Sequence, residues 1–316
     1  MRKLLLSLLA MTALLFVLDR AIGAGLERLF RASANPTDGD VLGHAWTMRA
    51  PVIVCGASRA SHHYVSDSLG ADLGAPVFNL GRDGSWGAAY EYGTAGILLN
   101  HYTPSLWIMD VDPMLVRTPE ILDRLSCFLP WAHSEPVARE LVGLRSHWEP
   151  VRLLSRIYPF NSMVLRLVAA HRGQDAAPRA GFLPLLGAMS PADVEREAVG
   201  VPGARADLDT LKLRFLARAI GALHARGVTV VAVRSPRFVR AEAAIARERL
   251  DGQELEQVFA RHGVRFLDLS SSAQPQWADP SLYRDASHLN ETGALRFTAE
   301  LADSLRAHAL LPAVRP

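Results

Sequence analysis

Short apolar runs alternate with longer stretches of helical periodicity over most of this chain. A run of about four to eight apolar residues bounded by turn residues is typical of a strand buried on both faces, and helical stretches between such runs indicate parallel pairing. Five runs fit this description: residues 52–55, 77–80, 106–110, 228–233 and 264–267. The pattern therefore predicts a doubly wound α/β fold with a five-stranded parallel sheet.

Capping residues indicate where one predicted helix ends and where another begins. A helical stretch at 207–226 stops at Gly227, a suitable C-cap, and Asn290 is a suitable N-cap for a last helix over residues 291–308. Between the third and fourth runs the chain is far longer than a crossover requires, which predicts a long helical insertion at about residues 115–205. Its aromatic side chains pack in a core or line a substrate cleft, and packing is the favoured interpretation. They include Phe128, Trp131, Trp148, Tyr158 and Phe182.

The N-terminus combines a basic start with a long apolar segment. Arg2 and Lys3 precede residues 4–18, which carry no charge, and Asp19 and Arg20 follow. A cleaved signal peptide and a membrane anchor both fit this pattern. The helical pattern continues as far as Phe30, which favours an uncleaved anchor over residues 1–32, a linker over 33–50 and one main domain, with the insertion, over 51–316. Both interpretations place the remainder across the membrane, because the positive end stays in the cytoplasm.

Charge and cysteine content exclude several classes of function. The formal net charge is +2, and the arginines are scattered among acidic residues, so we expect no nucleic-acid partner. Two cysteines cannot form a disulfide framework. No spacing of His, Cys, Asp or Glu recommends a metal site, and the chain is expected to use no cofactor.

Candidate catalytic residues follow the predicted strands, at the edge of the sheet where ligands bind. Ser58 follows the first strand, and His288 lies beyond the fifth, three residues after Asp285. A serine needs a base to take its proton, and the base needs a carboxylate to hold one tautomer. We therefore predict a triad of Ser58, His288 and Asp285, with the backbone N–H groups of Ser58 and Gly81 as oxyanion donors. His62 and His63 are expected to be surface residues.

Three stretches resemble a known family. Val52-Ile-Val-Cys-Gly-Ala-Ser-Arg-Ala60, Asn79-Leu-Gly-Arg-Asp-Gly84 and Asp285-Ala-Ser-His-Leu-Asn-Glu-Thr-Gly293 are similar to the first, second and fifth sequence blocks of the SGNH/GDSL hydrolases. The membrane-anchored branch, with the D-alanyl-transfer proteins of teichoic acid and the acetyl-transfer proteins of exported polysaccharides, is the most similar. The resemblance implies a flavodoxin-like three-layer α/β/α sandwich, Ser58 as nucleophile, Asp285 and His288 as its partners, and Gly81 as an oxyanion donor.

One departure from that family concerns the oxyanion hole. The family has an asparagine after the third strand, where this chain has Asp110 and Asp112. A carboxylate repels an oxyanion, so either the hole has two donors or Arg59 or Arg82 substitutes, and the loss of one donor costs about 100- to 1000-fold in rate. Alternatively the two aspartates are structural, and Asp112 caps the following helix.

These observations predict a serine esterase or O-acyltransferase that acts through an acyl-serine intermediate. It would be anchored in a bacterial inner membrane by a single N-terminal pass, with its catalytic domain facing the periplasm or the cell exterior. The expected substrate is an acylated polymer or a lipid-linked molecule, and a multispanning membrane acyltransferase is a candidate partner. The alternative is a catalytically impaired SGNH-like module that binds polymer or such a partner. A soluble lipase or thioesterase would require cleavage of the N-terminal segment.

Overall fold

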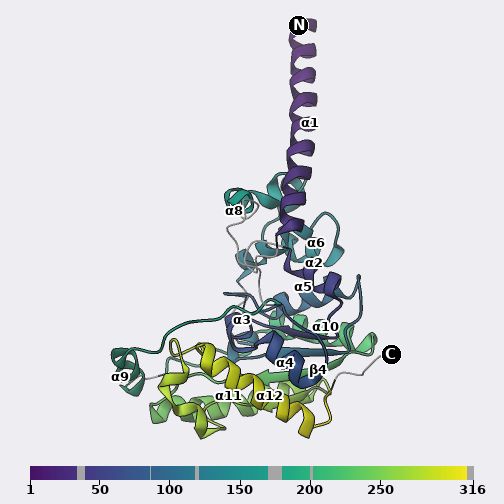
Figure 1. The fold of residues 1–316 in the computed structure, drawn as a ribbon. Helices are drawn as coiled ribbons and strands as arrows, with labels where there is room; N and C mark the ends of the chain where they lie inside the picture. The colour runs from purple at the N-terminus through teal and green to yellow at the C-terminus, as the bar shows by residue number, and fades with distance from the viewer. Residues whose placement is uncertain (34–39, 86, 118–120, 170–179, 200–201, 312–316) are drawn as a thin grey trace. The chain divides into compact units, whose positions relative to one another are not determined.

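The computed structural model describes residues 1–33, 40–85, 87–117, 121–169, 180–199 and 202–311. The chain forms two compact units (Figure 1). One comprises Met1–Gly43 and Leu122–Ala177, and is called the anchor unit below. The other comprises His44–Ile121 and Pro178–Pro316, and is called the sheet unit.

The sheet unit contains a five-stranded parallel sheet in the order β2-β1-β3-β4-β5. The strands are β1 (Val52–Cys55), β2 (Val77–Asn79), β3 (Leu106–Asp110), β4 (Thr229–Arg234) and β5 (Arg265–Asp268). All five predicted strands are confirmed. This is the strand order of flavodoxin-like folds, in which the chain reverses direction across the sheet between β1 and β3. The reversal leaves a crevice at the carboxyl ends of those two strands.

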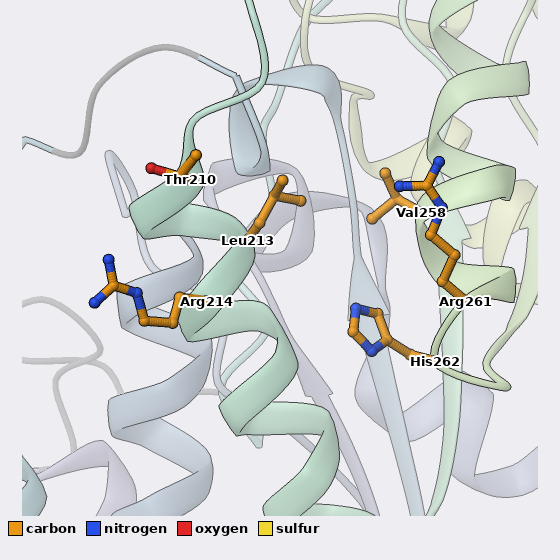
Figure 2. Close-up of a pocket in the computed structure, with 6 residues that line it drawn as sticks. All are labelled: Thr210, Leu213, Arg214, Val258, Arg261 and His262. Carbon is orange, nitrogen blue, oxygen red and sulfur yellow. The ribbon is translucent and has the colours of Figure 1, made fainter.

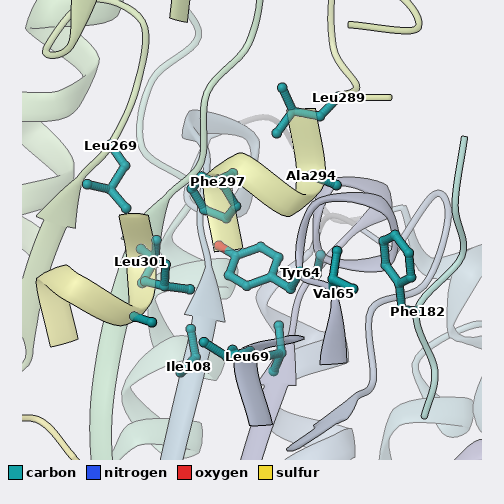
Figure 3. Close-up of a cluster of buried hydrophobic side chains, with 14 of the residues drawn as sticks. Tyr64, Val65, Leu69, Ile108, Phe182, Leu269, Leu289, Ala294, Phe297 and Leu301 are labelled. Carbon is teal, nitrogen blue, oxygen red and sulfur yellow. The ribbon is translucent and has the colours of Figure 1, made fainter. Parts of the chain in front are cut away.

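Helices cover both faces of the sheet and complete the predicted three layers. On one face lie α3 (Ser58–His63), α4 (Ser66–Leu73) and α12 (Glu291–Ala307), packed over the alternate strand residues Val52, Val54, Leu106 and Ile108. Figure 3 shows Tyr64 and Phe297 at the centre of this cluster, where their rings meet edge to face with centroids 5.0 Å apart. On the other face lie α5 (Ala88–Leu98), α10 (Thr210–Ala225) and α11 (Glu242–Ala260).

Polar side chains cap the two helices whose ends the sequence predicts. Asp209 accepts from the Lys212 N–H at 2.8 Å, so α10 begins at Thr210, and Asn290 accepts from the Gly293 N–H at 3.0 Å, as predicted for α12. Each cap satisfies an N–H group that has no partner within its helix. The Asn290 cap has a further consequence, because α12 begins three residues after His288 and fixes the end of the His288 loop.

The last part of the predicted insertion belongs to the sheet unit. The Asn79 N–H donates to the Ala180 carbonyl and the Leu183 N–H donates to the Ser61 carbonyl, each at 2.9 Å. Phe182 is buried in the core cluster, as the favoured interpretation expects. This segment therefore runs from the edge strand β2 to the first helix after β1. Further along, α9 (Pro191–Val199) precedes α10, and the unit also contains short helices at η1 (Pro113–Leu115), η5 (Pro275–Ala278) and η6 (Pro280–Leu282).

The anchor unit is organised around α1 (Arg2–Ala32), a single helix that is long and apolar enough to cross a membrane. Its first half is exposed, whereas Leu26 and Phe30 are buried. Phe30 contacts Trp131 and Phe160, with ring centroids 5.7 Å and 6.0 Å apart. The other helices are η2 (Leu122–Trp131), α6 (Pro136–Gly143), α7 (Glu149–Arg152), η3 (Tyr158–Phe160) and α8 (Val164–Ala169), while α2 (Val41–Met48) bridges the boundary between the units in sequence. The predicted domain boundaries stay a prediction.

Candidate active site

Ser58 lies on a sharp turn that connects β1 to α3. Gly56 has a φ of 155°, and a Cβ there would lie 2.9 Å from the Ala60 Cβ and 3.0 Å from the Asp110 Cβ. Only glycine fits this conformation and this close approach to the end of β3. Because the turn is so tight, Ser58 becomes the first residue of α3 at the carboxyl edge of the sheet. Its side chain is partly buried.

The three residues predicted as a triad meet in the structure. The Nε2 atom of His288 is 2.8 Å from Ser58 Oγ, although the two residues are 230 positions apart in the chain. The Nδ1 atom of His288 is 3.0 Å from both carboxylate oxygens of Asp285. This is the hydrogen-bonding order of a nucleophile, a base and a carboxylate that orients the base. The catalytic roles of these residues stay predictions.

The loop that carries His288 also holds Asp285 in its ionised form. Asp285 Oδ1 accepts from the backbone N–H groups of Ser287, at 2.8 Å, and His288, at 3.1 Å. Partial burial works to raise the pKa of Asp285, but the hydrogen bonds from His288 and from these N–H groups lower it below its ordinary value. A carboxylate that stays charged favours the tautomer in which His288 carries its proton on Nδ1 and presents Nε2 to Ser58.

His62 and His63 are buried, so the prediction that they are surface residues is wrong. His63 Nε2 accepts the Leu289 N–H at 3.0 Å and so ties α3 to the residue after His288. Burial, together with the charge of Arg59, lowers the pKa of His63 well below its ordinary value, so its ring is neutral. The His62 ring lies edge-on to that of His288, with centroids 5.4 Å apart.

His62 and Asp83 form a second histidine–aspartate pair beside the triad, which sequence reasoning missed. His62 Nε2 is 3.2 Å from Asp83 Oδ1, and His62 Nδ1 is 2.7 Å from the Leu183 carbonyl. Burial works to lower the pKa of His62, but the hydrogen bonds to Asp83 and Leu183 raise it. The hydrogen bond with His62 also lowers the pKa of Asp83. The pair therefore places an imidazole of raised pKa next to the ring of His288.

The loop after β2 lies directly on α3. A Cβ at Gly81 would come within 2.2 Å of the Ser61 nitrogen, so this position accepts only glycine. The Gly81 N–H donates to Asn79 Oδ1 at 2.8 Å, and the Arg82 N–H donates to the Gly56 carbonyl at 3.1 Å. Within the described residues, α3 has no side-chain cap, and Ser58 is its first residue. The Ser58 N–H therefore suits the predicted role of oxyanion donor, whereas that of Gly81 is already engaged; both roles stay predictions.

Asp110 and Asp112, the two aspartates at the end of β3, are bound to Arg59. An Arg59 nitrogen lies 3.0 Å from Asp112 Oδ2, and its Nε lies 3.7 Å from Asp110 Oδ2. Tyr64 donates to Asp110 at 2.7 Å, and burial raises the pKa of Asp110 although Arg59 opposes this. Asp112 also accepts the Met114 N–H at 2.6 Å, which confirms the alternative in which it caps the following helix.

This ion-pair cluster changes the interpretation of Arg59. Its guanidinium compensates two carboxylates and also donates to the Val111 carbonyl at 3.4 Å, so the geometry favours a structural role over one in the oxyanion hole. The role of Arg82 as a substitute donor in the oxyanion hole stays a prediction.

A hollow of about 450 Å³ opens between α10 and α11, away from the triad residues. Figure 2 shows the side chains that line it: Thr210, Leu213, Arg214, Val258, Arg261 and His262. None of them belongs to the triad or to the loops that carry it. In the part of the chain that the structure describes, no three His, Cys, Asp or Glu side chains are grouped so that they could hold a metal ion.

Comparison with known proteins gives distant likenesses of fold alone. No family model matches the chain, and no curated protein matches it. One solved structure, from Streptococcus pneumonia and provisionally described as a platelet activating factor, is 8% identical to it. The match covers 95% of this chain and 98% of that chain with a TM-score of 0.39. A likeness this distant carries no functional argument, so the function has to be inferred from the site itself.

Proposed function

We propose that this chain is a serine esterase or O-acyltransferase of the SGNH/GDSL type that works through an acyl-serine intermediate. The observation that carries the proposal is the continuous chain of hydrogen bonds from Ser58 Oγ through His288 to Asp285. A serine whose hydroxyl contacts an oriented imidazole is a serine prepared for nucleophilic attack. The order of sequence blocks shared with that family supports the same assignment.

The reaction follows from the positions of these three side chains. Ser58 Oγ attacks the carbonyl carbon of an ester while His288 Nε2 takes the hydroxyl proton, and the carbonyl oxygen becomes an oxyanion. When the intermediate collapses, the bond to the leaving alkoxide breaks and His288 returns the proton to it. The second half repeats these steps with water, which gives hydrolysis, or with an acceptor hydroxyl, which gives transfer. Asp285 stays ionised and stabilises the imidazolium in each half.

The proposed setting is the outer side of a bacterial inner membrane. The basic residues Arg2 and Lys3 before the apolar part of α1 would stay in the cytoplasm, which leaves the sheet unit facing the periplasm or the cell exterior. The resemblance to the membrane-anchored branch suggests O-linked acyl groups of a cell-envelope polysaccharide as substrate. A multispanning membrane acyltransferase would then be a suitable partner for acyl delivery.

Labelling with a fluorophosphonate probe tests the proposal. The full chain should be labelled at Ser58, and Ser58→Ala should lose the label together with at least about a 10,000-fold loss of activity on a simple aryl ester. Ser287→Ala is a matched control, because Asp285 contacts the backbone N–H of Ser287. The control should keep both properties. Labelling that persists in Ser58→Ala would refute the assignment.

A second candidate is a catalytically impaired module that binds polymer or a membrane acyltransferase. Two observations favour it: Asp110 and Asp112 stand where the family has an asparagine, and the Gly81 N–H is engaged by Asn79. This candidate predicts that the unaltered chain neither labels nor hydrolyses aryl esters, while the unaltered chain and Ser58→Ala bind an acylated polysaccharide equally well. Labelling and turnover by the unaltered chain exclude it.

A further inference from the structure

The anchor unit exposes several large apolar side chains on one short segment, residues 148–169, called the collar segment below. Trp148 and Val151 are more than half exposed, Leu154 is 70% exposed, and Leu165 is 85% exposed. The same segment buries Phe160, Met163 and Leu167 in the unit's core. It therefore carries a second set of apolar side chains that no described residue covers. Exposed apolar side chains gathered in this way mark interaction surfaces.

Hydrogen bonds fix the collar segment at a particular level of α1. Asp19 accepts from Ser155 Oγ at 2.5 Å and from the Arg156 N–H at 2.9 Å, and Arg20 donates to the Leu154 carbonyl at 2.9 Å. Asp19 is the first charged residue after the apolar residues 4–18. The collar segment is thus held where the apolar part of the helix ends.

Helix packing supports the same placement. A Cβ at Gly23 would lie 2.4 Å from the Arg156 Cβ, so the collar segment touches the helix backbone one turn beyond Asp19. In Figure 1, α8 lies beside α1 at the point where the exposed half of the helix begins. If α1 crosses a bilayer, this point lies at the boundary between acyl chains and headgroups.

The exposed charge of the collar segment is positive. Arg152, Arg156 and Arg166 are exposed, whereas Glu149, the one acidic residue among residues 148–169, is buried and accepts from Arg152 and Tyr158. Arginines beside exposed aliphatic side chains suit a surface with negative phosphate groups above an apolar layer. A tryptophan such as Trp148 is enriched at the same depth of a bilayer, because its ring is apolar and its N–H is polar.

We propose that the collar segment lies on the bilayer surface, with Trp148, Leu154 and Leu165 at the acyl-chain boundary and Arg156 and Arg166 against anionic phospholipid headgroups. The inference rests on the anchoring part of the proposed function and is independent of its chemistry. The protein then holds the membrane by two contacts, a spanning helix and an interfacial segment. Two contacts fix the orientation of the anchor unit, which a single spanning helix leaves free to rotate.

Tryptophan fluorescence tests this contact in the full chain, reconstituted in vesicles of phosphatidylcholine and phosphatidylglycerol. The emission of Trp148 is the part of the spectrum that Trp148→Phe removes. Lipids brominated near the headgroup end of the acyl chain should quench this part. Trp131→Phe is the control: Trp131 packs against Phe30, about 16 Å further along α1 than Asp19, so its emission should be unquenched. Arg156→Gln combined with Arg166→Gln should abolish the extra quenching that phosphatidylglycerol gives over phosphatidylcholine alone.

Two measurements together distinguish the membrane anchor from the collar contact. Alkaline washing of the vesicles reports whether α1 is inserted. A chain that resists washing while its Trp148 emission is unquenched would refute the collar contact and leave the anchor intact. The finding that a membrane protein, and not lipid, covers this surface would have the same meaning. A chain that washes off would refute the anchor and the collar contact together. Neither result bears on labelling of Ser58.

Discussion

At the scale of single residues, the environment of His288 depends on two neighbouring histidines with opposite pKa shifts. Hydrogen bonds to Asp83 and Leu183 raise the pKa of His62 against the effect of burial, whereas burial lowers that of His63. Their rings lie 5.4 Å and 6.3 Å from that of His288. His63 therefore acts as a neutral acceptor that positions the loop, and His62 is the neighbour that binds a proton more readily than an ordinary histidine.

The His62–Asp83 pair predicts a stability effect confined to mildly acidic pH. Because the pKa of His62 is raised, its contribution is fully present below about pH 6.5 and is lost as the pH rises through the folded-state pKa. The pKa of Asp83 is lowered, so its contribution is present above about pH 3.9 and is lost as the pH falls through the folded-state pKa. His62→Gln should cost about 0.5–1 kcal/mol near pH 5.5, since Asp83 is half-exposed, and less near pH 8.5.

Denaturant unfolding of the full chain in detergent, at both pH values, measures this difference. Asp285 and His288 also face His62, so Asp83→Asn is needed as a second variant that removes the partner alone. It should lose stability in the same pH window. An equal loss at both pH values in His62→Gln would mean that packing, and not charge, dominates at this position.

Sequence reasoning found the contact between Asp285 and His288 because three residues on a turn suffice to make it. It also placed Ser58 near them, since parallel strands bring their following loops to one edge of the sheet. Burial of His62 and His63 was not predictable in this way. The backbone groups that bind them belong to Leu183 and Leu289, which lie 121 and 226 positions away along the chain.

At the scale of elements, the approach of the β2 loop to α3 determines the shape of the candidate site. Gly81→Ala would place a Cβ 2.2 Å from a backbone nitrogen of α3, which cannot move without displacing Ser58. We expect this variant to lose about 1–3 kcal/mol of stability and most of its fluorophosphonate labelling. Gly221→Ala in α10 meets no atom within 4 Å and should be neutral or slightly stabilising.

Thermal unfolding and probe labelling of the two glycine variants, side by side, check this expectation. A Gly81→Ala protein with unchanged melting temperature and unchanged labelling would show that the loop can move away from α3. In that case the Gly81 N–H could also leave Asn79 and serve the oxyanion hole.

Local signals were sufficient for the regular elements but not for the insertion. The five strands and the start of α12 follow from runs of apolar residues and from one capping side chain, all of which are local in sequence. The insertion divides between two units, because residues 122–169 pack with α1 and residues 180–189 pair with β2, α3 and the His288 loop. Nothing in its periodicity distinguishes those partners, since both accept the same apolar side chains.

At the scale of the whole molecule, α1 combines two environments in one uninterrupted helix. Residues of its first half are exposed, while Gly23, Leu26 and Phe30 of its second half are buried in the anchor unit. A signal peptide is removed after translocation and needs no such packing. The helix instead forms part of the core that residues 122–169 complete, which supports a retained anchor.

Retention of the N-terminal segment is the prediction that belongs to this scale. Cleavage near Gly23 would remove Asp19 and leave the hydroxyl of Ser155 and the N–H of Arg156 without their acceptor. Each of these groups that stays buried would lower the free energy of unfolding by about 1–3 kcal/mol. We therefore expect the protein purified from membranes to contain peptides from residues 4–18 by mass spectrometry and to resist alkaline extraction. Asp19→Ala should keep the segment but speed amide hydrogen exchange at Arg156 and Ile157. A protein that begins near residue 24 and is released by alkaline extraction would show that the segment is a signal peptide, and the anchor unit would then have to fold without the first half of α1.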